Sequence, residues 1–178
     1  MPVHRQPPAR PADKGEFEQL VTELTKELTR PRDIGQPIIL EDETLETNSL
    51  RVHVIWERWA EWSGELRSRI VLESYERAFP KNARPQITLV LGLTVPEAVE
   101  MGLLPFKIVA ARQRAGLPLT QEDRQALLDA GATMQLRGND PQLRCATFDA
   151  AEATIKHLEK ELPNSRWTIV EEVSVHDD

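Results

Sequence analysis

The chain has 178 residues, a formal net charge of −7 and one cysteine. No apolar run approaches the roughly 20 residues needed to cross a bilayer, and no apolar stretch follows the N-terminal charges, so we expect one or two soluble domains without a signal sequence. A single thiol excludes an internal disulfide and favours the cytoplasm, while the excess of acidic residues in both halves argues against a nucleic-acid partner.

The first 30 residues predict a tail followed by a helix. Residues 1–15 hold four prolines and no apolar periodicity, which is typical of a disordered tail. From Glu16 to Arg30 the apolar residues recur at helical spacing, and Pro31 ends the helix. The residues expected on its buried face are Phe17, Leu20, Val21, Leu24 and Leu28.

A hairpin and a second helix are predicted next. Two β-rich runs, Pro37–Leu40 and Leu50–Trp56, flank a polar loop. Ser63 can cap a helix that extends to Phe79, with a buried side formed by Leu66, Ile70 and Tyr75. A strand over Gln86–Leu91 and a short helix that begins after Thr94 and ends at Gly102 complete a domain over residues 16–104.

Residues 105–178 predict a second domain. Strands are expected over Phe106–Ala110, Met134–Arg137, Leu143–Phe148 and Trp167–Val173, with a turn at residues 138–141. One helix begins at Thr120, with Asp123 completing a capping box and Gly131 as the stop, and a second is expected to be capped by Asp149. The order β-α-β-β-α-β is that of a ferredoxin-like split βαβ unit, so the predicted fold class is α+β.

Residues 17–98 carry a further pattern. A hydrophobic strand leads into the turn Glu57-Arg58-Trp59, then the Ser63 cap, the triplet Arg67-Ser68-Arg69 and the ending Thr94-Val95-Pro96-Glu97. This segment resembles BolA-like proteins, and the resemblance implies an α-β-β-α-β fold. A generic KH-like α/β layer explains the same order of elements equally well.

The departures from that family concern its chemistry. The resemblance implies a monothiol glutaredoxin partner and an iron–sulfur cluster held by a histidine. The histidine between the two arginines corresponds here to Ser68, and the one before the central strand corresponds to Ser49. His53 falls on the face of Arg51 and Ile55, several residues late. A hydroxyl is a poor ligand for iron–sulfur chemistry, so we expect no cofactor and no metal site, with a binding surface retained.

Three tryptophans near this turn are candidates for that surface. By strand alternation Trp56 is expected in the core, and Trp59, which occupies the aromatic turn position of the family, is expected there as well. Trp62 is the one expected to be exposed. With nearby arginines it forms the predicted binding set Arg58, Trp62, Arg67 and Arg69.

The sequence therefore favours a non-enzymatic, cytoplasmic interaction or regulatory module that binds a protein partner or a second copy, helped by open sheet edges. One alternative is a thiol enzyme that uses Cys145 with His157, although a buried, inert cysteine is expected. Another is a single-stranded nucleic-acid binder, against which the absent GxxG loop and the acidic charge count. Arg112 and Arg114, expected in a loop, could hold an anion.

Overall fold

The computed structural model describes residues 13–44, 49–83, 86–134 and 140–172. Within them the chain is mixed α+β, with two sheets and six α-helices. The described residues form two compact units: residues 13–31 with residues 37–94, and residues 32–36 with residues 95–172. The division falls ten residues before the predicted boundary at 104/105. Among the described helices, none is long and apolar enough to cross a membrane.

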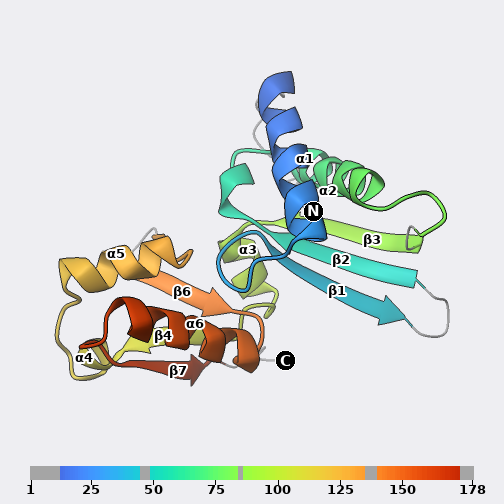
Figure 1. Ribbon diagram of the computed structural model, residues 1–178. Helices are drawn as coiled ribbons and strands as arrows, with labels where there is room; N and C mark the ends of the chain where they lie inside the picture. The colour runs from blue at the N-terminus through green and yellow to red at the C-terminus, as the bar shows by residue number, and fades with distance from the viewer. Residues whose placement is uncertain (1–12, 45–48, 84–85, 135–139, 173–178) are drawn as a thin grey trace, which may run out of the picture. The chain divides into compact units, whose positions relative to one another are not determined.

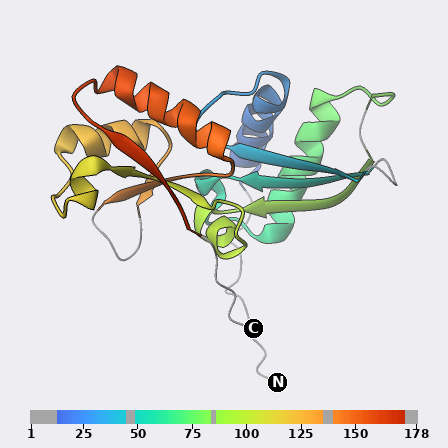
Figure 2. The same ribbon diagram turned by 90° about the horizontal axis from the view of Figure 1, so that it is seen from below.

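The first unit is a three-stranded sheet with two helices on one face (Figures 1 and 2). Strand β2 (Ser49–Ile55) lies in the middle, antiparallel to β1 (Ile38–Thr44) and parallel to β3 (Gln86–Leu93). Helices α1 (Lys14–Thr29) and α2 (Gly64–Ala78) pack against each other, and the 3-10 turn η1 (Glu57–Trp59) joins β2 to α2.

The sequence signals for α1 and α2 are confirmed. The Ser63 hydroxyl accepts a hydrogen bond from the Leu66 amide at 3.3 Å, which caps α2 as predicted. In α1 the predicted apolar stripe faces the core, and an unforeseen cap comes from Asp13, whose carboxylate accepts from the Gly15 amide. The largest fully buried side chains of this unit include Trp59, Tyr75, Leu20, Leu24 and Ile70.

Helix α2 approaches β3 closely at Gly92. A Cβ atom at this position would lie 2.4 Å from Cβ of Arg67 and 3.2 Å from the ring of Trp59. Both distances are shorter than van der Waals contact, so any side chain would push helix and strand apart. Glycine is therefore the residue that allows α2 to rest on the sheet.

The second unit is built on a four-stranded antiparallel sheet with the order β5-β6-β4-β7. Its strands are β4 (Phe106–Ala110), β5 (Thr133–Met134), β6 (Pro141–Cys145) and β7 (Trp167–Glu171). Its helices are α3 (Val95–Glu100), α4 (Ala111–Arg114), α5 (Gln121–Asp129) and α6 (Phe148–Glu161). Helices α5 and α6 contribute Leu127, Ala151 and Leu158 to the core of this unit.

Several predicted boundaries in the chain need correction. Strand β1 extends to Thr44, so the acidic run Glu41–Glu43 lies in a strand and not in the loop. The segment around Arg112 and Arg114 is the short helix α4. The cap of α6 is Thr147, not Asp149, because Thr147 has extended backbone angles and its hydroxyl accepts from the Ala150 amide at 3.2 Å.

Some predictions fall on residues that lie wholly or mainly outside the described chain. These are residues 1–12 of the proline-rich tail, most of the Met134–Arg137 strand and half of the turn at 138–141, while Lys14 and Gly15 of the predicted tail lie in α1. The predicted Trp167–Val173 strand is present as β7, which ends at Glu171.

Asp123 joins three segments of the second unit. The predicted capping box is confirmed, since Asp123 accepts from the Thr120 amide at 3.2 Å and donates its own amide to the Thr120 hydroxyl at 3.0 Å. Its other carboxylate oxygen accepts from the Ser165 hydroxyl at 2.6 Å, which fixes the loop between α6 and β7. Burial raises the pKa of Asp123, but the hydrogen bonds from Ser165 and Thr120 outweigh it, so the pKa lies below its usual value.

Replacing Gly92 by alanine should destabilise the protein by about 1–3 kcal/mol, because the added methyl group meets Arg67 and Trp59. Gly64→Ala is the matched control, since a Cβ there meets no atom within 4 Å and alanine favours a helix. Urea unfolding monitored by circular dichroism measures both. Equal midpoints for the two variants would contradict the close approach.

Asp123→Asn should lower the unfolding free energy by about 1–3 kcal/mol at neutral pH, because an amide cannot accept all the bonds that the carboxylate accepts. Since the pKa of Asp123 is depressed on folding, its contribution is present above the unfolded value of about 3.9 and is lost as pH falls through the folded value. The difference between wild type and variant should therefore shrink in acid. Asp129→Asn, an exposed change on the same helix, is the matched control and should leave the unfolding free energy at neutral pH nearly unchanged.

Candidate functional site

Arg67, one of the four predicted binding residues, is not at the surface. Its side chain is buried and donates to three backbone carbonyls: Trp62 at 2.8 Å, Ala60 at 3.1 Å and Gly92 at 3.4 Å. A guanidinium has five N–H donors in a fixed planar arrangement, so one side chain can donate to several backbone carbonyls that a tight turn leaves unpaired. Arg67 holds the turn between η1 and α2 against β3.

The prediction that Trp62 is exposed is wrong. Only 9 % of the residue is accessible, and its ring lies 6.2 Å from that of Phe17 in α1. The predicted burial of Trp56 and Trp59 is confirmed, and their rings meet edge to face at 5.6 Å. All three tryptophans thus belong to the core, and the Trp59 indole donates to the Leu93 carbonyl at 2.9 Å.

Arg58 and Arg69, the other two predicted residues, are exposed but lie over different parts of the core. Arg58 forms an ion pair with Glu23 of α1, and its guanidinium lies 5.4 Å from the centre of the Trp56 ring. Arg69 lies 5.8 Å from the centre of the Phe17 ring. Each arginine therefore covers an aromatic side chain at the edge of the core.

Arg69 also borders a shallow groove on the outward surface of α2. The groove is lined by five residues of this helix: Arg69, Leu72, Glu73, Glu76 and Arg77. Leu72 is 44 % exposed, although it is a large apolar residue in the middle of a well-packed helix. Four of these five residues were not predicted. One feature of the sequence indicates that Leu72 is exposed: this residue falls outside the buried stripe of the helix, which contains Ile70 and Tyr75.

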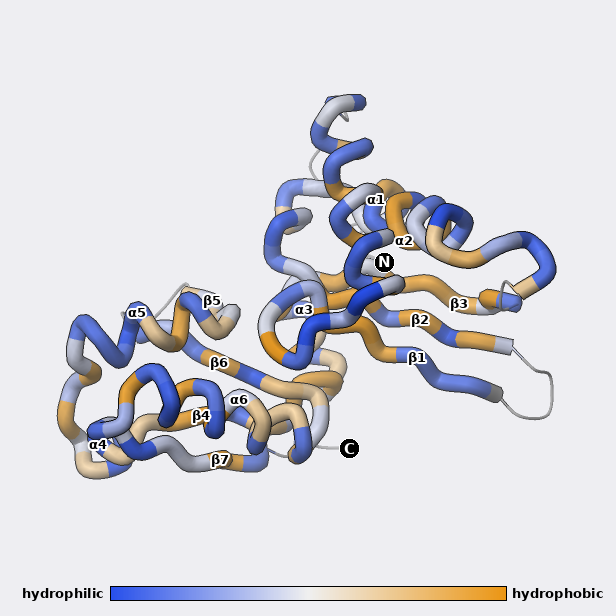
Figure 3. The backbone as a smooth tube through the Cα atoms, in the orientation of Figure 1, coloured by the Kyte–Doolittle hydropathy of each residue, from blue (hydrophilic) through white to orange (hydrophobic). Residues whose placement is uncertain are grey.

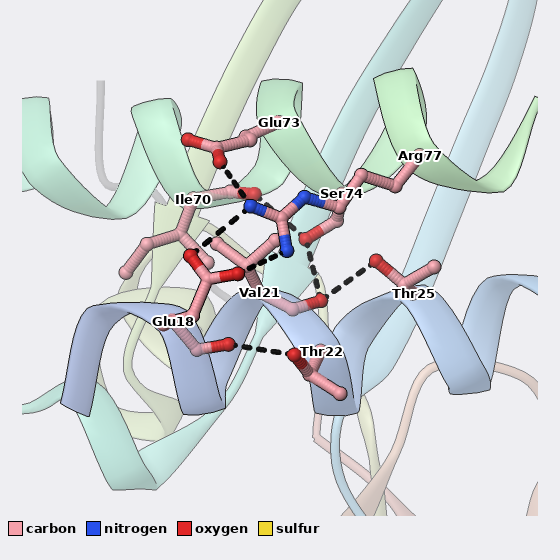
Figure 4. A network of polar contacts seen from close by, with 8 residues as sticks. All are labelled: Glu18, Val21, Thr22, Thr25, Ile70, Glu73, Ser74 and Arg77. Atoms are coloured by element: carbon pink, nitrogen blue, oxygen red, sulfur yellow. Dashed lines mark hydrogen bonds and ion pairs between the residues drawn. The ribbon is translucent and has the colours of Figure 1, made fainter. Parts of the chain in front are cut away.

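One side of this groove is fixed by polar contacts between α1 and α2 (Figure 4). Arg77 donates to both Glu18 of α1 and Glu73 of its own helix, and one of its bonds to Glu18 measures 3.1 Å. The bond from Arg77 lowers the pKa of Glu18. Deeper in the interface, the buried Ser74 hydroxyl contacts the Val21 carbonyl at 3.2 Å. These contacts hold the outward surface of α2 in one orientation.

Tyr75 fixes the opposite side of α2. Its hydroxyl donates to Glu41 of β1, and burial together with this bond raises the pKa of Tyr75 well above its usual value. The phenol therefore stays protonated at neutral pH and remains a donor. The Ser63 cap holds the start of α2, the Arg77 contacts hold the helix along its length, and the Tyr75 bond holds its inner face. The groove is therefore a rigid surface.

Cys145 lies in β6 beneath α6. Its thiol is buried, and its polar neighbour is the Thr154 hydroxyl at 3.9 Å. Burial raises the pKa of Cys145, which lowers the fraction of reactive thiolate. The predicted burial of Cys145 is confirmed. The polar group that contacts its thiol is the hydroxyl of Thr154, which is not the base that a thiol enzyme needs.

His53 is the one histidine among the described residues of the first unit. It lies in β2 between Leu40 of β1 and Leu91 of β3. Its neighbours in the sheet are therefore apolar. Among the described residues, no group of three or more His, Cys, Asp or Glu side chains is arranged to hold a metal ion.

The chain was also compared with known proteins. No family model, no curated protein and no solved structure matches it.

Cys145 should react slowly with a thiol reagent in the native protein and rapidly once the protein is unfolded in urea. A burst of labelling at neutral pH in the folded state, with mass spectrometry identifying Cys145, would contradict the burial and restore the thiol-enzyme hypothesis.

Proposed function

We propose that this protein is a non-enzymatic interaction or regulatory module of the cytoplasm, and that it binds through the outward surface of α2. The observation that carries the proposal is Leu72, an exposed apolar side chain at the centre of a groove bordered by charged residues. An apolar centre with a polar rim is the usual arrangement of a protein-binding patch.

The rigidity of this surface supports the same function. Helix α2 is fixed by its cap, by Arg77 and by Tyr75, so ordering the helix would cost little when a partner binds. A preformed helix that presents residues at i, i+3 and i+7 offers the spacing that other helices and grooves recognise. Arg69, Leu72 and Glu76 have this spacing.

The topology supports the family reading of the first unit as part of the proposal. The order α1-β1-β2-α2-β3, with β3 parallel to β2, is what a BolA-like or KH-like layer requires. The strand order β5-β6-β4-β7, antiparallel throughout, is what a ferredoxin-like second unit requires. We propose these two folds for the two units.

Ser68 supports a role without an iron–sulfur cluster. Its hydroxyl donates to the Val90 carbonyl at 3.2 Å, so at the position of the family histidine this chain has a side chain bonded to the sheet. Binding in this proposal rests on side-chain contacts alone, and it needs no shared cofactor.

Site-specific photo-crosslinking tests the function. A photoreactive amino acid in place of Leu72 should give discrete cross-linked protein products in the cells that produce the protein. The same substitution at Leu128 of α5, which is 39 % exposed, serves as the matched control and should give none. Identical product patterns from the two positions, or no product from position 72, would overturn the proposal.

A further inference from the structure

Strand β7 forms one border of the sheet in the second unit (Figure 1). Its ladder with β4 shows which of its backbone groups are already used. The Ala111 amide donates to the Arg166 carbonyl at 2.8 Å, and the Glu172 amide donates to the Pro105 carbonyl at 2.9 Å. Hydrogen-bonded residues alternate along an antiparallel strand, so the even-numbered residues of β7 bond to β4. The residues whose amides and carbonyls point away from the sheet are therefore Trp167, Ile169 and Glu171.

This outer edge of β7 is open and unprotected. Within the part of the chain that the structure describes, no group bonds to its outward amides and carbonyls. The strand contains no proline, and Glu171 at its end is its one charged residue. By contrast, the outer strand β1 of the first unit contains three successive carboxylates, Glu41–Glu43. An edge rich in β-branched residues and without such protection is a template for a further strand.

The position of β7 is fixed before any partner binds. Ser165, in the loop before the strand, donates to Asp123 at 2.6 Å, and the Trp167 side chain is buried in the core of the second unit. Arg166 donates to the carbonyls of Pro163 at 3.1 Å and Ser165 at 3.4 Å, so its side chain is directed back to its own loop. A partner strand therefore meets a preformed edge, which lowers the entropy cost of binding.

The outward groups of β7 match those of a second, antiparallel β7. A two-fold axis perpendicular to the sheet at Ile169 pairs Trp167 with Glu171 of the other copy, and Ile169 with its own equivalent. Each pair exchanges two bonds, so every outward residue of both strands is used in a total of about six hydrogen bonds. On the other face of the sheet, Thr168 lies opposite Val170 of the other copy. The side chains at the centre of the pair are thus β-branched, which favours cross-strand packing.

The charges at the ends of β7 do not oppose this pairing. Glu171 of one copy lies opposite Trp167 of the other, and the two Glu171 residues are about 14 Å apart along the strands, at a rise of about 3.4 Å per residue. Arg166 of one copy lies opposite Glu172 of the other, so no two acidic residues face each other. The pairing does not require this last contact, because Glu172 is already bonded to Arg144 and Lys107 in its own copy.

From this match we infer that the outer edge of β7 binds a second copy of this chain, as a two-fold antiparallel β7–β7 pair with Ile169 on the axis. The pair joins the two four-stranded sheets into one continuous sheet. It uses the open edge of both copies, so assembly through this edge stops at two. A contact built on one strand from each copy is small, and the dimer should therefore be weak and concentration-dependent. The interface lies in the second unit and is separate from the α2 surface of the proposed function.

Proline substitution tests the pairing by sedimentation equilibrium of the full chain, at concentrations up to about 1 mM. Glu171→Pro removes an outward amide and leaves the ladder with β4 intact, because β4 bonds to the even-numbered residues. Dimerisation should weaken at least about tenfold, since the change removes a hydrogen bond at both symmetric positions. Glu171→Ala is the matched control: it keeps the amide, and its dimerisation should stay within about threefold of wild type.

Disulfide cross-linking tests the register and captures even a weak dimer. In the pair, Thr168 and Val170 of the other copy lie directly opposite each other with Cα atoms about 4.5 Å apart, within reach of a disulfide. On mild oxidation, an equimolar mixture of Thr168→Cys and Val170→Cys should give the mixed disulfide at least about tenfold in excess over either symmetric product. Each variant alone places its thiols on a diagonal of about 7–8 Å between Cα atoms, beyond that reach. Cys145 is buried and present in every sample.

The outcomes separate this inference from the proposed function, once circular dichroism verifies that each variant is folded. A wild-type chain that stays monomeric throughout, equal dimerisation of Glu171→Pro and Glu171→Ala, or disulfides formed in the statistical ratio would each overturn the β7 pair. Leu72→Ser, on the exposed surface of α2, should leave the dimer unchanged. Loss of the dimer in this variant would place the contact on α2 and also overturn the β7 pair.

Discussion

The contact between Arg67 and Gly92 determines where α2 lies, and the rest of the first unit depends on it. The absence of a side chain at Gly92 lets the helix approach the parallel edge of the sheet. The guanidinium of Arg67 then donates to carbonyls of the turn and of the strand, which ties α2 to both. Once this contact is made, the orientation of α2 is fixed and the helix can present only one surface outward.

Helix α1 completes the support from the other side. Leu20, Val21 and Leu24 pack into the shared core, while Glu18 reaches the border of the groove through Arg77. Apolar packing and the ion pairs thus act on different sides of α1. The exposed ion pairs add little to stability individually, but they hold Glu73 and Arg77 together at the border of the groove. The surface that we propose for binding is in this sense a product of how the two helices meet.

Local signals in the sequence predicted the elements well. Ser63 and the Thr120–Asp123 box mark helix starts by a short-range mechanism that needs no tertiary information. The alternation in β2 likewise predicted that Trp56 is buried. The error at Asp149 has a local origin as well, since Thr147 competes for the same role and takes it with extended backbone angles.

The site residues were harder to predict, because the side chains of arginine and tryptophan occur both in the core and at the surface. Arg67 and Arg69 are two residues apart on one helix, yet the first is buried under a turn and the second lies at the surface. Trp62 was expected to be exposed because strand alternation and the turn position of the family assigned the other two tryptophans to the core, but Phe17 of α1 covers it, and this neighbour comes from 45 residues earlier in the chain. Such choices depend on tertiary packing that periodicity does not contain.

The two outer strands of the first sheet have a consequence for the protein at high concentration. On β1, three successive carboxylates repel any like-charged strand, and Figure 3 shows this end of β1 as hydrophilic. Strand β3 is largely hydrophobic. Its Leu93 carbonyl points toward β2, where it accepts from the Trp56 amide, so the carbonyls of Val90 and Gly92 point to the open edge. There Ser68 and Arg67 already donate hydrogen bonds to them. An extra residue near Thr88 further bends this edge. Both outer strands of this sheet thus disfavour the repeated strand addition that leads to amyloid. A concentrated solution of the protein should therefore favour finite assemblies over fibres.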